Sequence, residues 1–331
     1  MTDRLEGEGR LRQRLRTDET MELSIIIPTY NRSKLLRRTL QGLCEQVDAD
    51  RLLEVLVVND GSTDGTSDAV DEFSGSLPVR RISQPKSGVS TARNRGLREA
   101  RGRVVLLLDD DVIPSSKLVL EHTDFHRQFP ALESVLLGYV TWLPELRITP
   151  FMRWYGEYGA LFGYALLEDG SQVDRRFLYT CNISFKTDFL RANGGFNEDL
   201  TVHEDHELGF RLAKQGMRMF FRRNALGYHN QSFTFQQACD RVQRYSKGFG
   251  AFLSTEAGRE MTRSEVAWKS QLKRVAKYCV VRPVNSLKFL IDSNLRLPHS
   301  FYRAVYWYFA TLPSSQVKSN ARSTAERASD K

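Results

Sequence analysis

The chain has 331 residues, of which 41% are hydrophobic and 11% aromatic, so it can form one large domain with or without an extension. Its four cysteines form no CxxC pair, which argues against a zinc ribbon or a dense disulfide framework and favours a reducing compartment. No apolar run reaches the roughly 18 residues that span a bilayer, and the charged first 20 residues lack the apolar stretch of a signal peptide, so we expect a cytoplasmic protein.

The positive charge of the chain is concentrated in one segment. The formal net charge is +8, and residues 236–310 hold 13 Lys and Arg against 5 Asp and Glu, which accounts for the whole excess. A basic segment on a neutral body suggests contact with an anionic partner, such as a membrane surface or a phosphorylated acceptor. A solvated basic surface explains the same charge equally well.

Strand and helix patterns alternate along the first third of the chain. Short apolar runs typical of buried parallel strands cover 23–27, 54–58, 79–82 and 104–108. Helical patterns separate them, beginning at Ser33, near Thr66 and at Ser90. This alternation predicts βαβ units and therefore an α/β fold with a mainly parallel central sheet flanked by helices.

Polar residues follow three of these predicted strands. They are Thr29-Tyr30-Asn31, Asn59-Asp60 and Asp109-Asp110-Asp111. Ligands bind beyond the carboxyl ends of the strands in such sheets, so these groups should converge on one edge. Because the chain contains neither GxGxxG nor GxxxxGKS or GxxxxGKT, a dinucleotide dehydrogenase and a P-loop enzyme are both disfavoured.

Three consecutive aspartates after a buried strand need compensation. Like charges this close raise one another's pKa or bind a cation between them. Mg²⁺ and Mn²⁺ favour one or two carboxylates together with substrate phosphates, so Asp109, Asp110 and Asp111 form a candidate metal site. Acids that favour the start of a helix near Pro114 are the alternative explanation.

A second acidic cluster, His203-Glu204-Asp205-His206-Glu207, precedes apolar residues at helical spacing. Its acids therefore fall in the first turn of a helix, where capping accounts for one of them. Two acids and two histidines exceed what capping requires. A carboxylate held there near a substrate could act as a general base.

The other histidines are weaker candidates. His229 follows a strand predicted over 217–221 and is either a structural residue or a ligand of a metal or phosphate. His122 and His126 are four residues apart on a predicted helix, a spacing that can bind zinc. No third ligand lies near them in the sequence, so we expect both to be surface residues.

Residues 142–179 are rich in aromatic side chains, whose flat rings suit the faces of sugars. They could form an acceptor platform, with Trp154 as the exposed candidate. The alternative is a helix that packs its aromatic face onto the sheet.

The pattern after residue 235 is helical and basic, with aromatic edges. Such helices could contact a membrane peripherally, pack on the catalytic domain or form a homodimer. We therefore divide the chain into a flexible segment 1–20, a catalytic domain 21–235, a basic helical extension 236–312 and a disordered tail 313–331.

Six segments, in this order, resemble the family 2 glycosyltransferases. They are ELSIIIPTYNR (22–32), VLVVNDGSTDGT (55–66), SGVSTARNRG (87–96), VVLLLDDDV (104–112), GGFNEDL (194–200) and HEDHELGFRL (203–212). The resemblance covers residues 22–230 and implies a GT-A fold. It also implies inverting transfer of a sugar from a nucleotide-sugar, most often a UDP-sugar, to a hydroxyl of a glycan or lipid-linked acceptor.

The resemblance assigns nucleotide binding to residues of the first three segments. The residues that would line the nucleoside pocket are Pro28, Thr29, Tyr30 and Asp60, the last bonded to the base. Arg93 and Asn94 would lie near the nucleotide and its phosphates.

The resemblance also assigns the metal and the chemistry. Asp109 and Asp111 match the outer positions of the DxD motif, with Asp110 in its variable middle place. Asp111 would be the principal ligand of Mn²⁺ or Mg²⁺, Asp109 would act near the ribose and the metal, and His229 falls where some members have a further ligand. The residues expected near the reacting groups are Asp205 as catalytic base, Glu204 beside it and Asn182 at the donor sugar.

Two other classes of protein compete with this interpretation. A catalytically silent nucleotide-sugar-binding scaffold could have the same fold, although both acidic clusters are intact. A nucleotidyltransferase usually has a glycine-rich loop after its first strand, and residues 28–32 contain no glycine. Nucleic-acid binding is disfavoured because the basic residues match no recognised module.

Overall fold

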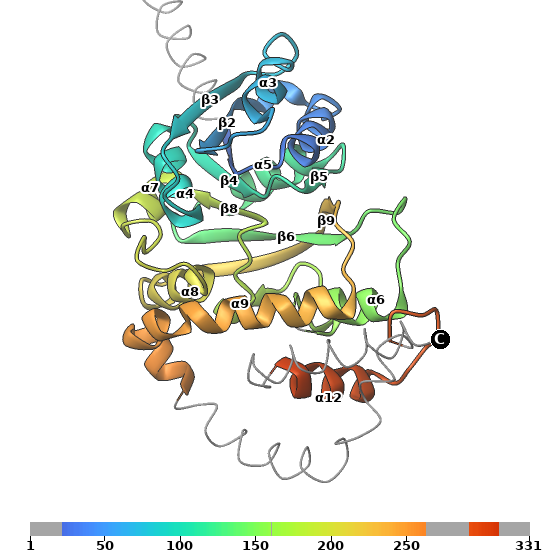
Figure 1. Ribbon diagram of the computed structural model, residues 1–331. Helices are drawn as coiled ribbons and strands as arrows, with labels where there is room; N and C mark the ends of the chain where they lie inside the picture. The colour runs from blue at the N-terminus through green and yellow to red at the C-terminus, as the bar shows by residue number, and fades with distance from the viewer. Residues whose placement is uncertain (1–21, 160, 263–290, 311–331) are drawn as a thin grey trace, which may run out of the picture. The chain divides into compact units, whose positions relative to one another are not determined.

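The computed structural model describes residues 22–159, 161–262 and 291–310 (Figure 1). Their contacts form two compact units. Among the described residues, the first comprises 22–143 together with 167–230, and the second comprises 144–166 and those from 231 to 310. The sequence prediction kept 144–166 in the catalytic domain, whereas its contacts lie in the second unit. The predicted terminal segments 1–20 and 313–331 lie outside the described residues, as does much of the basic extension.

The first unit is built on a mixed sheet, with nine strands among the described residues. Its order is β3-β2-β1-β4-β8-β6-β9-β5, and β7 also pairs with β9 (Figure 1). The strands are β1 (Leu23–Thr29), β2 (Leu52–Asp60), β3 (Val79–Gln84), β4 (Val104–Leu108), β5 (Val112–Pro114), β6 (Ser134–Trp142), β7 (Gln172–Val173), β8 (Asn182–Lys186) and β9 (Arg218–His229).

Strand direction divides this sheet into two halves. β3, β2, β1 and β4 run parallel, which confirms the predicted α/β class. β8 runs antiparallel to both β4 and β6, and β9 runs parallel to β6. The short β5 is antiparallel to β9 and brings the chain after β4 against the end of β9.

Helices cover the parallel half because its central strands, β1 and β4, and most of β2 are apolar on both faces. The helices of the first unit are α2 (Ser33–Cys44), α3 (Thr66–Asp71), α4 (Val89–Glu99), α5 (Leu118–Gln128), α7 (Thr187–Ala192) and α8 (Glu204–Lys214), with 3-10 turns η1 (Ala49–Arg51) and η3 (Arg175–Phe177). α4 packs on β1 and β2, and α5 packs on β6 and β9. Gly96 allows the close approach of α4, since a Cβ there would overlap the Ile26 side chain.

The two histidines of α5 are fully buried, so the prediction that they are surface residues was wrong. Together with Asn182 and Ser184 of β8 they form a hydrogen-bonded group, which we call the histidine cluster. Ser184 Oγ lies 2.7 Å from His122 Nδ1 and 2.9 Å from His126 Nε2. His122 Nε2 lies 2.9 Å from Asn182 Oδ1. These partners follow 58 to 62 residues later in the chain, which is why the sequence did not reveal them.

Asn182 sets the protonation of the histidine cluster. Its Nδ2 donates to the Ala225 carbonyl at 2.8 Å, so its Oδ1 is the acceptor that faces His122. His122 therefore carries its proton on Nε2 and accepts the Ser184 hydroxyl at Nδ1, and Ser184 accepts from His126. Both rings are neutral: burial lowers the pKa of His122 to about 4 and lowers that of His126 well below its usual value.

The second unit is helical and packs through aromatic rings. Its elements are α6 (Pro150–Glu157), η2 (Tyr164–Leu166), α9 (Phe235–Ser254) and α12 (His299–Ala310). Trp154 of α6 is only 2% exposed and stacks on Tyr302, with 5.8 Å between ring centroids. The prediction of an exposed, acceptor-binding Trp154 is therefore wrong, because α12 covers this ring. Within the part of the chain described here, none of the helices combines the length and apolarity needed to cross a membrane.

Candidate active site

Three strand ends bring polar residues to one edge of the sheet, as predicted. β1 ends at Thr29, β2 ends at Asp60, and Asp109 directly follows β4. These residues are neighbours because β1 pairs with both β2 and β4. Pro28 and Thr29 are buried in β1, whereas Tyr30 is 41% exposed beside the edge.

Asp110 ties the segment after β4 to the segment after β1. Its Oδ2 accepts from Thr29 Oγ1 at 2.8 Å, and its Oδ1 accepts from Arg32 Nη1 at 2.7 Å. Thr39 of α2 donates to its main-chain oxygen at 2.9 Å. Burial outweighs the effect of Arg32 and raises the pKa of Asp110 to about 7. The variable middle residue of the motif is therefore the most firmly held of the three aspartates.

Asp111 lies beside His229, although 118 positions separate them in the sequence. The pairing of β5 with β9 places Val112 opposite His229, and the Asn230 N–H donates to the Asp111 carbonyl at 2.7 Å. Asp111 Oδ2 consequently lies 3.9 Å from His229 Nε2. The same oxygen accepts from Arg32 at 2.9 Å. Arg32 belongs to a segment that the sequence singled out, but its contact with the aspartates was not predicted.

Arg93 of α4 connects the two acidic clusters. Its guanidinium lies 3.2 Å from Asp109, 3.1 Å from Glu204 and 3.8 Å from Asp205. The residue is 4% exposed, so these ion pairs are shielded from water. Burial and the nearby Asp111 raise the pKa of Asp109, against the opposing effect of Arg93. Arg93 was expected near the phosphates, and the structure places it between carboxylates.

Asp205 lies in the first turn of α8, and its carboxylate accepts two hydrogen bonds from Thr180, which precedes β8. Thr180 donates to its Oδ1 from the hydroxyl at 2.9 Å and to its Oδ2 from the main chain at 3.3 Å. Burial, and then the charge of Glu204, raise the pKa of Asp205 to about 7. A carboxylate with this pKa can take up a proton near neutral pH. The orienting role of Thr180 was not predicted, because no local pattern links residues 180 and 205.

Asp60 organises the loop that follows β3. It accepts hydrogen bonds from Gln84 and from the main chain of Ser87 and Gly88, at 2.8, 2.8 and 2.9 Å. Burial alone would raise the pKa of Asp60, but these bonds outweigh it and lower that pKa. Lys86 of the same loop lies 3.2 Å from the Asp60 carboxylate and 3.2 Å from the centre of the Tyr30 ring. Lys86 thus connects Asp60 with Tyr30, and a contact of either residue with a nucleoside stays a prediction.

Asn94 holds a distant loop in place. Its Nδ2 donates to the Phe196 carbonyl at 2.9 Å and to Glu198 at 2.8 Å, while its Oδ1 accepts from the Phe196 N–H at 2.8 Å. Gly195 has a φ of +63°, and a Cβ there would collide with the Asn94 side chain. A direct contact of Asn94 with a nucleotide stays a prediction.

The acids of both motifs form one group, which we call the carboxylate cluster. Its members are Asp109, Asp110, Asp111, Glu204 and Asp205. Two guanidiniums, those of Arg32 and Arg93, contact these five carboxylates. If every acid were ionised, negative charge would exceed positive charge, which favours a bound cation.

The donor types beside Asp111, a carboxylate and an imidazole, suit a divalent ion, although no three His, Cys, Asp or Glu residues in the described ranges are placed to hold one by themselves. Two ligands at about 2.1 Å from an octahedral ion lie about 3.0 Å apart when adjacent and about 4.2 Å apart when opposite. The 3.9 Å between Asp111 Oδ2 and His229 Nε2 matches neither distance, so these side chains would shift to share an ion. Phosphate oxygens from a substrate would complete such a site.

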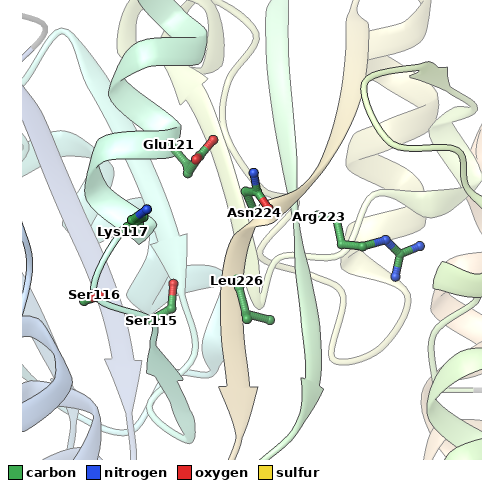
Figure 2. A pocket seen from close by; sticks show the side chains of 7 residues that line it. All are labelled: Ser115, Ser116, Lys117, Glu121, Arg223, Asn224 and Leu226. Atoms are coloured by element: carbon green, nitrogen blue, oxygen red, sulfur yellow. The ribbon is translucent and has the colours of Figure 1, made fainter.

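One surface hollow, of about 260 Å³, lies apart from these residues (Figure 2). It is lined by Ser115, Ser116, Lys117, Glu121, Arg223, Asn224 and Leu226. None of the predicted site residues borders it.

Comparison with known sequences identifies relatives. The profile described as Glycosyl transferase family 2 matches residues 24–133, and that described as Glycosyl transferase family group 2 matches 104–314. Validoxylamine A glucosyltransferase of Streptomyces hygroscopicus subsp. limoneus is 33% identical over 242 residues, which cover 62% of this chain and 51% of the relative. Chondroitin synthase of Escherichia coli is 28% identical over 252 residues, covering 66% and 36%. The chain thus spans about half or less of these relatives.

Solved structures share the fold. The mannosyltransferase PcManGT of Pyrobaculum calidifontis, in complex with GDP-Man and Mn²⁺, has a TM-score of 0.57 at 19% identity, covering 87% of this chain and 84% of its own. Residues 1–349 of S. aureus TarS have a TM-score of 0.54 at 19% identity, covering 90% and 92%, and were also solved with UDP-GlcNAc. The sequence matches show that this chain belongs to the family 2 glycosyltransferases, and the structural matches show that it has the GT-A fold.

Proposed function

We propose that this chain is an inverting glycosyltransferase that moves a sugar from a nucleoside-diphosphate sugar to an acceptor hydroxyl. The arrangement around Arg93 carries the proposal. One buried guanidinium contacts Asp109 at the end of β4 and both Glu204 and Asp205 at the start of α8. It therefore links the sheet edge where a nucleotide is expected to a carboxylate that can accept a proton.

Asp205 is the proposed general base. In its ionised form it takes the proton of the acceptor hydroxyl, whose oxygen attacks the anomeric carbon from the side opposite the leaving group. The bond from that carbon to the diphosphate breaks, its electron pair leaves with the phosphate oxygen, and the configuration inverts. Thr180 keeps the carboxylate oriented, and burial together with the charge of Glu204 keeps the pKa of Asp205 high enough for proton uptake.

Asp111, with Asp109 and His229, is proposed to hold Mn²⁺ or Mg²⁺. When bound, the ion supplies positive charge that stabilises the diphosphate leaving group. Asp110 keeps this segment in place through Thr29. The proximity of a carboxylate and an imidazole at Asp111 and His229, and the excess of carboxylates over guanidiniums among the described contacts, support this assignment.

The nucleoside is proposed to lie against Pro28, Thr29, Tyr30 and Asp60. We expect a UDP-sugar donor. Structural neighbours were solved in complex with UDP-GlcNAc and with GDP-Man, so GDP requires testing as well. The relative named chondroitin synthase supports a glycan acceptor, with a lipid-linked acceptor as the alternative. The predicted membrane contact and homodimer involve the basic extension, of which residues 263–290 lie outside those described, and both stay predictions.

Calorimetric titration of UDP, GDP and dTDP, each with and without Mn²⁺, tests this function. We expect one nucleotide to bind in a Mn²⁺-dependent way and to bind at least about 10-fold more weakly to Asp111→Ala. Asp199→Ala, which removes an exposed acid from a loop, is the matched control and should bind as the wild type does. Binding of none of the three would contradict the donor assignment, and binding without any sugar transfer would favour the silent scaffold.

A further inference from the structure

Arg32 approaches the buried aspartates from the solvent side. Its Nη1 donates to Asp110 Oδ1 at 2.7 Å and to Asp111 Oδ2 at 2.9 Å. The exposed fraction of the Arg32 side chain is 37%, against 5% for Asp110 and 6% for Asp111. The carboxylates are therefore fixed within the protein, while the cation that contacts them sits on a long side chain that can turn outward.

Both aspartates have other anchors. Thr29 donates to Asp110 Oδ2, and Thr39 donates to the main-chain oxygen of Asp110. The main-chain oxygen of Asp111 accepts from the Asn230 N–H at 2.7 Å. Departure of Arg32 would leave these hydrogen bonds intact, so its main contribution at this position is charge.

The Asp111 oxygen that accepts from Arg32 is also the one that faces His229. Asp111 Oδ2 and His229 Nε2, 3.9 Å apart, are the pair proposed above to hold a divalent cation. A guanidinium and a divalent cation on one oxygen repel each other, so each weakens the binding of the other. A diphosphate offers the oxygen acceptors that a displaced guanidinium needs, because arginine forms charge-assisted hydrogen bonds with phosphate.

We propose that Arg32 is a positioning residue that couples metal binding to donor binding. Its guanidinium opposes the binding of a divalent cation alone and turns to the diphosphate when the cation binds together with the nucleotide. This proposal rests on the function proposed above. It requires that cation and nucleotide strengthen each other's binding, and by linkage the factor is the same in both directions.

Mn²⁺ binding to the full chain, measured from the electron paramagnetic resonance signal of free Mn²⁺, tests the proposal with and without UDP, GDP or dTDP. For Arg32→Gln we expect Mn²⁺ alone to bind about 10-fold more tightly, and Mn²⁺ with nucleotide to bind about 10-fold more weakly, the size of one charge-assisted hydrogen bond. Arg32→Lys keeps the charge, and Lys34→Gln removes a charge from an exposed position in the first turn of α2, two residues after Arg32. Both should bind Mn²⁺ alone within about threefold of the wild type.

The outcomes separate the two proposals. If none of the three nucleotides raises the Mn²⁺ affinity of the wild type, both the metal-dependent function and the Arg32 proposal are contradicted. The Arg32 proposal alone is overturned if a nucleotide raises the Mn²⁺ affinity of the wild type but Arg32→Gln binds Mn²⁺ alone no more tightly than the wild type does. Equal tightening in Arg32→Lys also overturns it, since charge would then not be the cause. Thermal unfolding identifies a misfolded variant, and Arg32→Met provides a second neutral substitution with the same expected results.

Discussion

Two buried polar groups on the same sheet, the carboxylate cluster and the histidine cluster, are balanced in opposite ways. In the histidine cluster each ring is neutral, and Asn182, Ser184 and His122 match donor to acceptor in one direction. In the carboxylate cluster five acids share two guanidiniums, and Asp110 and Asp205 both have a pKa raised to about 7. The first arrangement is neutral, although His126 Nδ1 is buried without a hydrogen-bond partner among the described residues, whereas the second calls for additional positive charge.

This difference separates stability from function. A buried network of neutral, hydrogen-bonded side chains rigidifies the fold and needs no added charge. A cluster with unbalanced charge costs stability and is retained where a substrate or ion supplies the balance. Variants of the carboxylate cluster should therefore change turnover and binding, and variants of the histidine cluster should change the free energy of unfolding.

The largest effect is expected for Asp205→Asn. The amide cannot accept the acceptor's proton, so turnover should fall by about 10²–10⁴-fold. Nucleotide binding should stay close to that of the wild type, because Arg93 retains its contacts with Asp109 and Glu204. Initial rates with the identified donor, compared with calorimetric affinities, measure the two effects. Near-wild-type turnover would rule out Asp205 as the base, and Asp199→Asn controls for removal of a nearby exposed charge.

A smaller effect, on stability, is expected for His126→Ala. The substitution leaves a cavity in a fully buried site and removes the donor to Ser184, at an expected cost of about 2–4 kcal/mol in the free energy of unfolding. Urea unfolding measures this cost. Nucleotide affinity of the folded variant should change by less than about twofold, since no contact links His126 to the carboxylate cluster among the interactions described. A large loss of nucleotide affinity with an unchanged free energy of unfolding would contradict the structural role assigned to the histidine cluster.

The same contrast explains what could be predicted from the sequence. Local patterns predict the first half of the sheet. β1 and β4 are apolar because both of their faces are buried, and the chain becomes polar at Thr29, where β1 ends, and at Asp109, directly after β4. Functional acids also stand out locally, because three adjacent aspartates are costly without a partner. The positions of these residues at one edge followed from parallel strand topology alone.

Pairings across long stretches of chain could not be predicted. Burial of His122 depends on Asn182 and Ser184, and burial of Trp154 depends on Tyr302. Arg93 was expected at the phosphates because only its motif was visible, not the acids of α8 that surround it. In each case the partner is far away in sequence, and a single sequence contains no signal of that contact.

Acidification should destabilise the chain through the histidine cluster. The pKa of His122 is about 4 in the folded chain and about 6.5 unfolded, so the unfolded state binds the proton first. The resulting stability is fully present above pH 6.5 and is lost as the pH falls towards 4. His122 alone accounts for a loss of about 2 kcal/mol between pH 7 and pH 5, and His126 adds to it.

Comparison of His126→Gln with the exposed control His299→Gln separates the contribution of the buried histidine to the acid-induced loss of stability from that of the carboxylates. Glutamine offers an amide donor to Ser184 but does not titrate. The loss of unfolding free energy between pH 7 and pH 5 should be smaller in His126→Gln and unchanged in His299→Gln. Identical losses in all three proteins would show that the His126 ring does not contribute to the acid response.

The smallest effect is expected for Glu204→Gln, and it bears on the carboxylate cluster. Burial and then the charge of Glu204 raise the pKa of Asp205, so removal of that charge should lower it. A base must be ionised to act, so kcat/KM of the wild type should fall as the pH drops below about 7. In Glu204→Gln this acidic limb should move to lower pH by about half a unit, because Arg93 is then shared among fewer acids. A pH–rate profile at saturating nucleotide-sugar measures the shift of this acidic limb. A shift to higher pH would mean that Glu204 acts on Asp205 chiefly by positioning Arg93 rather than through its own charge.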